Sequence, residues 1–126
     1  MKLFSILFTQ IVMFIAISAH AEFKSFSKTD YEAAIKSGAP VVIDFHASWC
    51  PTCKKQEPLL NEIVGSKGYE KVVALKADFD KEKELKKSLN VSKQSTIVVF
   101  KDGKEVGRSV GSTSKDDLKK LIDLGL

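Results

Sequence analysis

The hydrophobic pattern of this chain contains three short apolar runs in its central part. They lie at residues 41–45, 72–75 and 96–100 and consist largely of valine, isoleucine and phenylalanine. Nearly continuous apolar runs of this length are typical of strands that are buried on both faces of a sheet. We expect the second of these strands to end near Asp78. Because Asp102-Gly103 favours a tight hairpin turn, we expect a further strand at residues 105–110 that returns antiparallel to the third run.

Around these runs, apolar residues recur with the spacing of amphipathic helices. We expect helices at residues 29–36, 50–64, 81–89 and 114–124. Thr29 and Glu32 match a capping box that predicts the start of the first helix, Gly38 predicts its end, and Pro58 predicts a kink inside the second. Strands that alternate with helices and finish in a hairpin predict one α/β domain, in which helices cover both faces of a mixed sheet.

The first residues of the chain differ in kind from the rest. Lys2 precedes a largely apolar stretch at residues 3–17 without any charge, and this stretch leads into Ala19-His20-Ala21. A basic residue, an apolar run and small residues at a cleavage-like end are typical of a secretory signal peptide. We therefore expect residues 1–21 to be a signal peptide and residues 22–126 to be one exported domain, periplasmic or otherwise outside the cytoplasm. The alternative is an uncleaved membrane anchor, but the run is shorter than the about 20 residues that spanning requires.

The charge distribution argues against a nucleic-acid-binding protein. The formal net charge is +4, and loss of residues 1–21 removes one lysine and no acidic residue, which leaves +3. At residues 81–87 the lysines are interleaved with glutamates, which is typical of a solvated helix face. Basic residues are not interleaved with aromatic ones as single-strand binding requires.

The two cysteines of the chain form the sequence Cys50-Pro51-Thr52-Cys53, where a predicted strand gives way to a predicted helix. This arrangement predicts a redox-active pair. Residues three apart in the first turn of a helix lie close enough for a disulfide, and the helix start favours a thiolate. We expect Cys50 to attack the disulfide of a partner and Cys53 to resolve the mixed disulfide.

Three other roles compete for the cysteines. A structural disulfide would close a loop too short to stabilise the fold by much. A closed zinc site needs four ligands, whereas the mature chain offers two sulfurs and His46, so we predict no metal. Inert buried thiols are disfavoured by the helix start and by an oxidising destination.

The segment from Val42 to Lys54 resembles the signature of the thioredoxin family, in which an apolar strand leads through a buried aspartate to Trp-Cys-x-x-Cys-Lys. The resemblance covers residues 26–124 and includes a helix proline, a strand lysine and two glycines around the hairpin: Pro58, Lys76, Gly103 and Gly111. It implies a thioredoxin-like three-layer α/β/α sandwich with a mixed central sheet. It also implies protein-disulfide oxidoreductase activity without a bound cofactor.

By the same resemblance, Asp44 would be a buried, water-linked base for Cys53, and Lys76 would lie nearby and tune it. A lone buried carboxylate is costly, and its pKa rises. The alternative for Asp44 is a polar residue at a strand end. His46 replaces an aromatic residue common in the family, and it either perturbs the thiols or only occupies a half-exposed position. The implied partner-contacting residues are Trp49, Pro51, Thr52, Gln94, Ser95 and Thr96.

The chain departs from the family at Ser95, where thioredoxins carry a cis-proline that shapes the groove for substrate backbone. No proline follows Pro58. Because a cis bond without proline costs about 2.5–4 kcal/mol, we expect the Gln94–Ser95 bond to be trans and the loop to differ. The Ser95 hydroxyl is a candidate hydrogen-bonding group for a sulfur or a bound molecule.

The direction of electron flow is suggested by the residues around the cysteines. Pro51-Thr52 offers no cation that would stabilise the Cys50 thiolate, and Asp44 with Lys76 resembles reducing thioredoxins, so we favour a reductase over an oxidase. We expect a monomer that exchanges with disulfide-bearing or dithiol proteins, and family precedent implies a membrane thiol transporter as electron donor. The alternative is a thioredoxin-fold binding module, or a metal- or haem-maturation chaperone, without general turnover.

Overall fold

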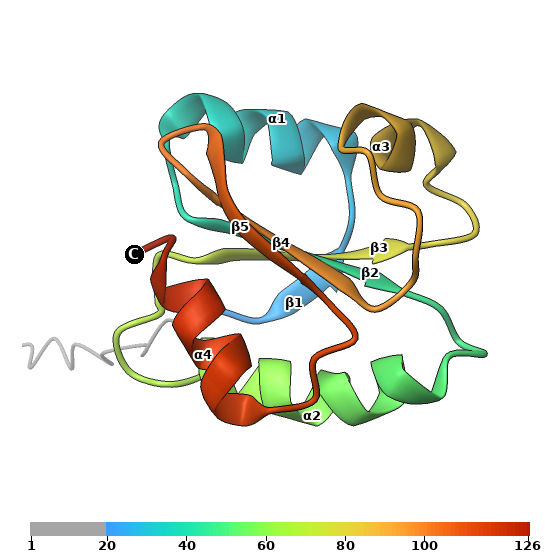
Figure 1. Ribbon diagram of the computed structural model, residues 1–126. Coiled ribbons are helices and arrows are strands. Elements are labelled where there is room, and N and C mark those ends of the chain that lie inside the picture. Colours follow the sequence, from blue (N-terminus) through green and yellow to red (C-terminus); the bar gives the residue numbers. More distant parts are fainter. Residues whose placement is uncertain (1–19) are drawn as a thin grey trace, which may run out of the picture.

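The computed structural model describes residues 20–126, which form a five-stranded sheet between two pairs of helices (Figure 1). The elements follow in the order β1 (Phe23–Ser25), α1 (Lys28–Ser37), β2 (Val41–His46), α2 (Pro51–Val64), β3 (Val73–Asp78), α3 (Lys83–Ser88), β4 (Thr96–Lys101), β5 (Lys104–Val110) and α4 (Lys115–Asp123). The predicted signal peptide lies outside the described residues, apart from His20 and Ala21. Across residues 20–126, the helices are too short or too polar to cross a membrane.

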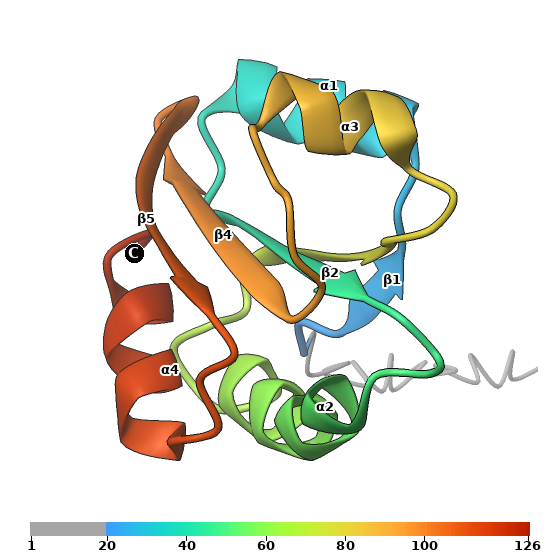
Figure 2. The same cartoon turned by 45° about the vertical axis from the view of Figure 1, so that its right-hand side comes forward.

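The sheet is mixed and has the strand order β1-β3-β2-β4-β5. β3 runs parallel to both β1 and β2, whereas β4 is antiparallel to β2 and β5 is antiparallel to β4. In Figure 2, α1 and α3 lie together over one face of the sheet, and α2 and α4 lie over the other. The predicted three-layer α/β/α architecture is confirmed.

Strand β1 is missing from the sequence-based prediction. It has only three residues, two of them exposed, so it carries no periodic apolar signal. Its place at the edge of the sheet comes from parallel pairing with β3, which aligns Phe23 with Ala74. The strand therefore depends on a partner about 50 residues away in the sequence rather than on its own residues.

The pleat of β2 sorts its side chains between the two faces of the sheet. Ile43 and Phe45 belong to the core under α1 and α3, whereas Val42 belongs to the core under α2 and α4. Because side chains two residues apart share a face, Asp44 and His46 lie on the α2 side with Val42. The central strand thus presents two polar side chains to the helix that carries the cysteines.

The first helix begins at Lys28, so the prediction of a capping box at Thr29 is wrong. Its N-cap is Ser27, whose Oγ accepts a hydrogen bond from the Asp30 N–H at 3.3 Å. Ser27 and Asp30 repeat the capping pattern two residues upstream of Thr29, so the sequence contains two overlapping candidates. The structure uses the upstream candidate.

The remaining boundaries agree with the predictions to within about two residues, and the largest difference is at the start of α3, which begins at Lys83 rather than at residue 81. β3 runs from Val73 to Asp78 and so continues past the apolar run through Lys76, which confirms the predicted end near Asp78. Register with β2 maintains this extension, because His46 pairs with Asp78 at the end of both strands. Backbone pairing therefore carries the strand beyond its hydrophobic part.

The C-cap of α1 is Gly38, as predicted, and it adopts the left-handed conformation with φ of 75°. We expect Gly38→Ala to lower the free energy of unfolding by about 1 kcal/mol, because a Cβ disfavours this backbone conformation. A Cβ at this position would meet no atom closer than 3.6 Å, so crowding adds little. Denaturant unfolding of both proteins measures the difference.

The matched control is Gly38→Asn, because asparagine tolerates left-handed backbone better than alanine does. It should lose less stability than Gly38→Ala. Equal losses in the two variants would contradict a conformational origin of the effect.

Candidate active site

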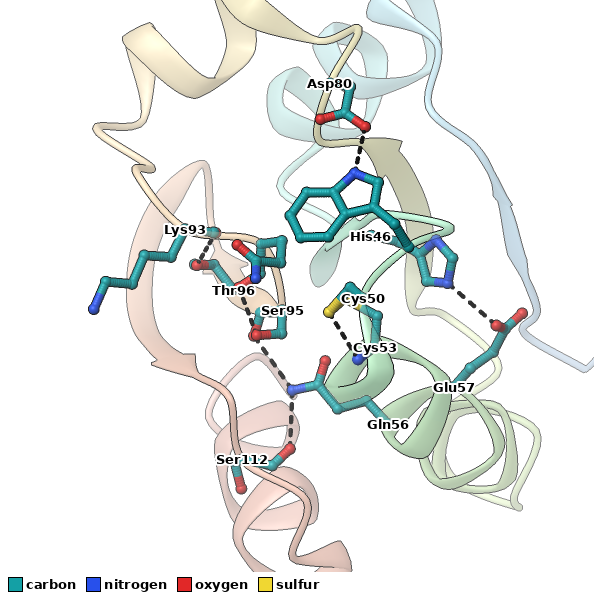
Figure 3. Close-up of a disulfide and its surroundings, with 12 residues drawn as sticks. His46, Cys50, Cys53, Gln56, Glu57, Asp80, Lys93, Ser95, Thr96 and Ser112 are labelled. Atoms are coloured by element: carbon teal, nitrogen blue, oxygen red, sulfur yellow. Dashed lines mark hydrogen bonds and ion pairs between the residues drawn. A yellow bond between two sulfur atoms is a disulfide. The ribbon is translucent and has the colours of Figure 1, made fainter.

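The cysteine pair lies at the junction between β2 and α2. Cys50 is the N-cap of α2, and Pro51 occupies the first turn of the helix. Cys50 and Cys53 form a disulfide whose Cα atoms are 5.3 Å apart. The Cys50 Sγ also accepts a hydrogen bond from the Cys53 N–H at 3.1 Å (Figure 3). The two cysteines thus meet at the helix start, at the place that their spacing predicts.

The start of α2 favours the thiolate form of Cys50 when the disulfide is reduced. The helix is 14 residues long, and its free N–H groups and dipole place partial positive charge at its N-terminus. The Cys53 N–H already points at the Cys50 sulfur. Because a thiolate is the attacking species in disulfide exchange, this geometry activates Cys50.

The surface beside the disulfide carries a large exposed aromatic side chain. Trp49 is 55% exposed, although its Nε1 donates a hydrogen bond to Asp80 Oδ2 at 2.8 Å. Pro51 is exposed and Thr52 is half-buried, whereas both cysteines are buried. A fixed, exposed indole next to a buried disulfide forms an apolar platform that a partner can cover.

Asp44 is buried on the α2 side of β2 and is only 3% exposed. Its Oδ1 has no hydrogen-bond partner among the described residues. Burial raises the pKa of Asp44 from 3.8 to about 7, while the positive charge of Lys76 lowers it and the negative charge of Glu57 raises it further. A carboxyl group with this pKa can both hold and release a proton near neutral pH. The predicted burial of Asp44 is confirmed; its role as a base remains a prediction.

Lys76 lies next to Asp44 across the two central strands, where their Cα atoms are register partners. Its Nζ, however, donates a hydrogen bond to Glu57 Oε1 at 3.0 Å, so its direct ionic partner is Glu57. The hydrogen bond from Lys76 lowers the pKa of Glu57. The charge of Lys76 therefore lowers the pKa of Asp44 without a direct hydrogen bond. The negative charge of Glu57, the ionic partner of Lys76, acts in the opposite direction and raises that pKa.

His46 completes this group, and its Nε2 lies 3.4 Å from Glu57 Oε2 (Figure 3). Burial lowers the pKa of His46, the charge of Lys76 lowers it further, and Glu57 opposes both. The net lowering of its pKa favours the neutral form of the ring. The sequence analysis missed Glu57, although its position four residues after Cys53 predicts that it shares a helix face with that cysteine.

The loop that precedes β4 differs from that of a cis-proline thioredoxin. No cis peptide bond occurs in residues 20–126, so the Gln94–Ser95 bond is trans as expected. Ser95 adopts a left-handed conformation with φ of 60°, and its N–H donates to Phe45 O at 2.8 Å. A proline fits neither feature, because its φ is fixed near −65° and it has no N–H. This loop conformation therefore accommodates serine but not proline.

The side chains of this loop turn inward. The Ser95 hydroxyl donates to the carbonyl of Gln94, and the Thr96 hydroxyl donates to the carbonyl of Lys93. Ser95 and Thr96 are buried, whereas Gln94 is half-buried. The suggested bond from the Ser95 hydroxyl to a sulfur is therefore absent in this disulfide form. Of the three loop residues predicted to contact a partner, only Gln94 has an accessible side chain.

The chemistry of the site rests on the two sulfurs, with a buried carboxyl group on the α2 side of β2. Within residues 20–126, no three His, Cys, Asp or Glu side chains are grouped so as to hold a metal ion. The arrangement provides a reducible disulfide, a helix start that stabilises one thiolate, and a buried group that titrates near pH 7. A reducible disulfide and a stabilised thiolate are the elements that thiol–disulfide exchange requires.

Comparisons with known proteins agree with this chemistry. The thioredoxin family profile matches residues 22–124. Thioredoxin of Chlamydia muridarum is 42% identical over 96 residues, which cover 76% of this chain and 91% of that protein. The mitochondrial thioredoxin of Bos taurus is 39% identical over 95 residues, which cover 72% of this chain and 57% of that protein.

Solved structures give the same result. Trxlp from Edwardsiella tarda superposes with a TM-score of 0.78 at 35% identity, covering 80% of this chain and 98% of that one. Malassezia sympodialis thioredoxin superposes with a TM-score of 0.72 at 26% identity, covering 84% and 93%. A profile match over nearly the whole described domain, with relatives at this level of identity, shows that the chain belongs to the thioredoxin family and is a thiol–disulfide oxidoreductase.

Proposed function

We propose that this chain is an exported protein-disulfide reductase. The observation that supports reduction rather than oxidation of partners is the pair of residues between the cysteines at the start of α2, Pro51 and Thr52. Neither intervening residue supplies a cation, so the Cys50 thiolate has the helix start as its stabilising feature. A less stabilised thiolate makes the dithiol a better electron donor.

Export is supported by the composition of the first residues and by the extent of the family match. Residues 1–21 have the pattern of a signal peptide, and the match to the thioredoxin family begins at residue 22. An exported reductase works in an oxidising space and needs a continuous supply of electrons. A membrane thiol transporter that passes electrons from cytoplasmic thiols is the donor we propose.

In the proposed reaction, the Cys50 thiolate attacks one sulfur of a partner disulfide. A new Cys50–partner disulfide forms, and the other partner sulfur leaves as a thiolate that takes up a proton. Cys53 then loses its proton and attacks the Cys50 sulfur, which releases the second partner thiolate. The partner gains two electrons and two protons, and the Cys50–Cys53 disulfide is restored. Asp44 is the proposed acceptor of the Cys53 proton, through a water molecule.

A second candidate function is a binding module or maturation chaperone without turnover. The observation that favours it is the left-handed Ser95 at the family's cis-proline position, which changes the loop beside the disulfide. Reduction of insulin by dithiothreitol separates the two functions. A reductase accelerates this reaction and loses the effect on Cys50→Ser, whereas a binding module leaves the rate unchanged.

The reduction potential of the Cys50–Cys53 pair tests the direction of electron flow. We expect a value of about −270 mV, as for a reducing thioredoxin, rather than about −120 mV, as for a strong oxidant. Equilibration of the mature protein with defined thiol buffers gives the value. Thr52→His is the matched variant, and it should raise the potential because an imidazolium beside Cys50 stabilises the reduced form. A wild-type value near that of the strong oxidant would make the protein a disulfide donor.

The mature N-terminus tests export. When the full chain is expressed in a bacterium, N-terminal sequencing of the extracytoplasmic protein should give a chain that begins at Glu22. The control is Ala21→Phe, which places a bulky residue where signal cleavage requires a small one. Recovery of the uncleaved chain from the cytoplasm would contradict the proposal.

The pH dependence of stability tests the state of Asp44. Because folding raises the pKa of Asp44 from 3.8 to about 7, the folded form binds more protons than the unfolded chain between these values. The contribution of Asp44 to the free energy of unfolding is therefore fully present below about pH 4 and is lost as the pH rises through about 7. We expect this loss to disappear in Asp44→Asn, as measured by denaturant unfolding of the oxidised proteins at several pH values.

Glu57→Gln provides the comparison for this prediction. It removes a negative charge near Asp44 and frees Lys76 from its ionic partner, and both changes lower the pKa of Asp44. The loss of stability should then occur at lower pH than in the wild type. Parallel pH profiles for the wild type and Asp44→Asn would refute the assignment of a raised pKa to Asp44.

A further inference from the structure

A glutamine lies in the interior of the active-site helix, one turn after Cys53. Gln56 is fully buried, although the other buried positions that follow on α2 are apolar. Its Nε2 donates one hydrogen bond to Ser95 O at 3.2 Å and another to Ser112 O at 2.9 Å (Figure 3). A buried amide is unfavourable unless it is hydrogen-bonded. These two bonds satisfy the Nε2 group, whereas the Oε1 atom is buried without a hydrogen-bond partner among the described residues.

The orientation of the Gln56 amide follows from its partners. Both partners are carbonyl oxygens, which accept hydrogen bonds, so only the amide nitrogen can face them. An apolar side chain of the same shape would fill the space but would leave Ser112 O without this donor. Gln56 therefore acts as a specific connection between three segments: α2, the loop before β4, and the link between β5 and α4.

The loop that Gln56 contacts has a backbone that needs support. Ser95 adopts the left-handed conformation, which is unfavourable for residues with a Cβ. Three hydrogen bonds involve the backbone of Ser95: its N–H donates to Phe45 O at 2.8 Å, and its carbonyl accepts from the Gly111 N–H at 3.0 Å and from Gln56 Nε2. The Gln56 bond is the one that joins the loop directly to the helix of the cysteines.

We propose that Gln56 is a positioning residue that holds the backbone of residues 94–96 in register with the disulfide for an extended, disulfide-bearing partner chain. The inference rests on the activity of the family and adds to it a specificity-determining residue. A protein substrate needs both the sulfurs and this loop, whereas a small disulfide needs only the sulfurs. Loss of the Gln56 hydrogen bonds therefore impairs reaction with protein disulfides and spares reaction with small ones.

The test compares Gln56→Met with the wild type in the mature protein, because methionine retains the length of the side chain and removes its donor. With dithiothreitol as reductant, we expect the KM for insulin to rise roughly fivefold to tenfold, as for loss of one or two hydrogen bonds, with little change in kcat. The rate with a small aromatic disulfide should stay within about twofold. Amide hydrogen exchange at Ser95 and Gly111 should become faster.

The control is Val64→Ala, which removes buried volume from the C-terminal end of the same helix, where Val64 belongs to the apolar core under α2 and α4. It should lower stability without changing the KM for insulin. An unchanged KM in Gln56→Met, or an equal rise in Val64→Ala, would overturn the proposal. Failure of the wild type to reduce insulin would contradict the reductase proposal, not the positioning role of Gln56. The positioning role would then be tested by hydrogen exchange alone, and unchanged exchange at Ser95 and Gly111 in Gln56→Met would overturn it.

Discussion

The pleat of β2 is the constraint on which the active site depends. Residues 41–45 of this strand are all buried between β3 and β4, so its side chains must alternate between two covered faces. A shift of register by one residue would move Asp44 into the apolar core under α1 and α3 and would turn Phe45 toward α2. The apolar residues on one face therefore determine the polar residues on the other. The end of the same strand also determines where Cys50 can begin α2.

The consequence is a small group of titratable side chains on the α2 side of the sheet. Lys76 lies beside the buried Asp44, yet its hydrogen bond goes to Glu57, which is more exposed. A direct ion pair with Asp44 would require two charges to leave water, which is expensive. With Lys76 directed to Glu57, Asp44 keeps a pKa near neutrality and suits proton transfer at physiological pH. The position of one lysine thus accompanies a lowered pKa of Glu57 and a raised pKa of Asp44.

The loop at Ser95 shows how this chain retains the family fold with a different active-site neighbour. A proline restrains a loop through its ring, whereas Ser95 is restrained by hydrogen bonds on both its N–H and its carbonyl. One of those bonds comes from Gln56, which occupies a fully buried helix position where an apolar residue is usual. The departure at Ser95 and the polar core position at Gln56 are therefore parts of the same local arrangement.

The local elements of this protein were predictable from its sequence, because they depend on neighbouring residues. Apolar runs predicted the three buried strands, Asp102-Gly103 predicted the hairpin, and the spacing of Cys50 and Cys53 at a strand–helix junction predicted the disulfide. Residue pairs far apart in the sequence were decided only by tertiary structure. β1 is a strand because it pairs with the edge of β3. Lys76 binds Glu57 because β3 and α2 lie against each other in the fold. Gln56 contacts Ser95, which is 39 positions away in the chain. Sequence periodicity predicts the face of a helix or strand on which a side chain lies. The residue that the side chain contacts depends on how those faces pack against one another.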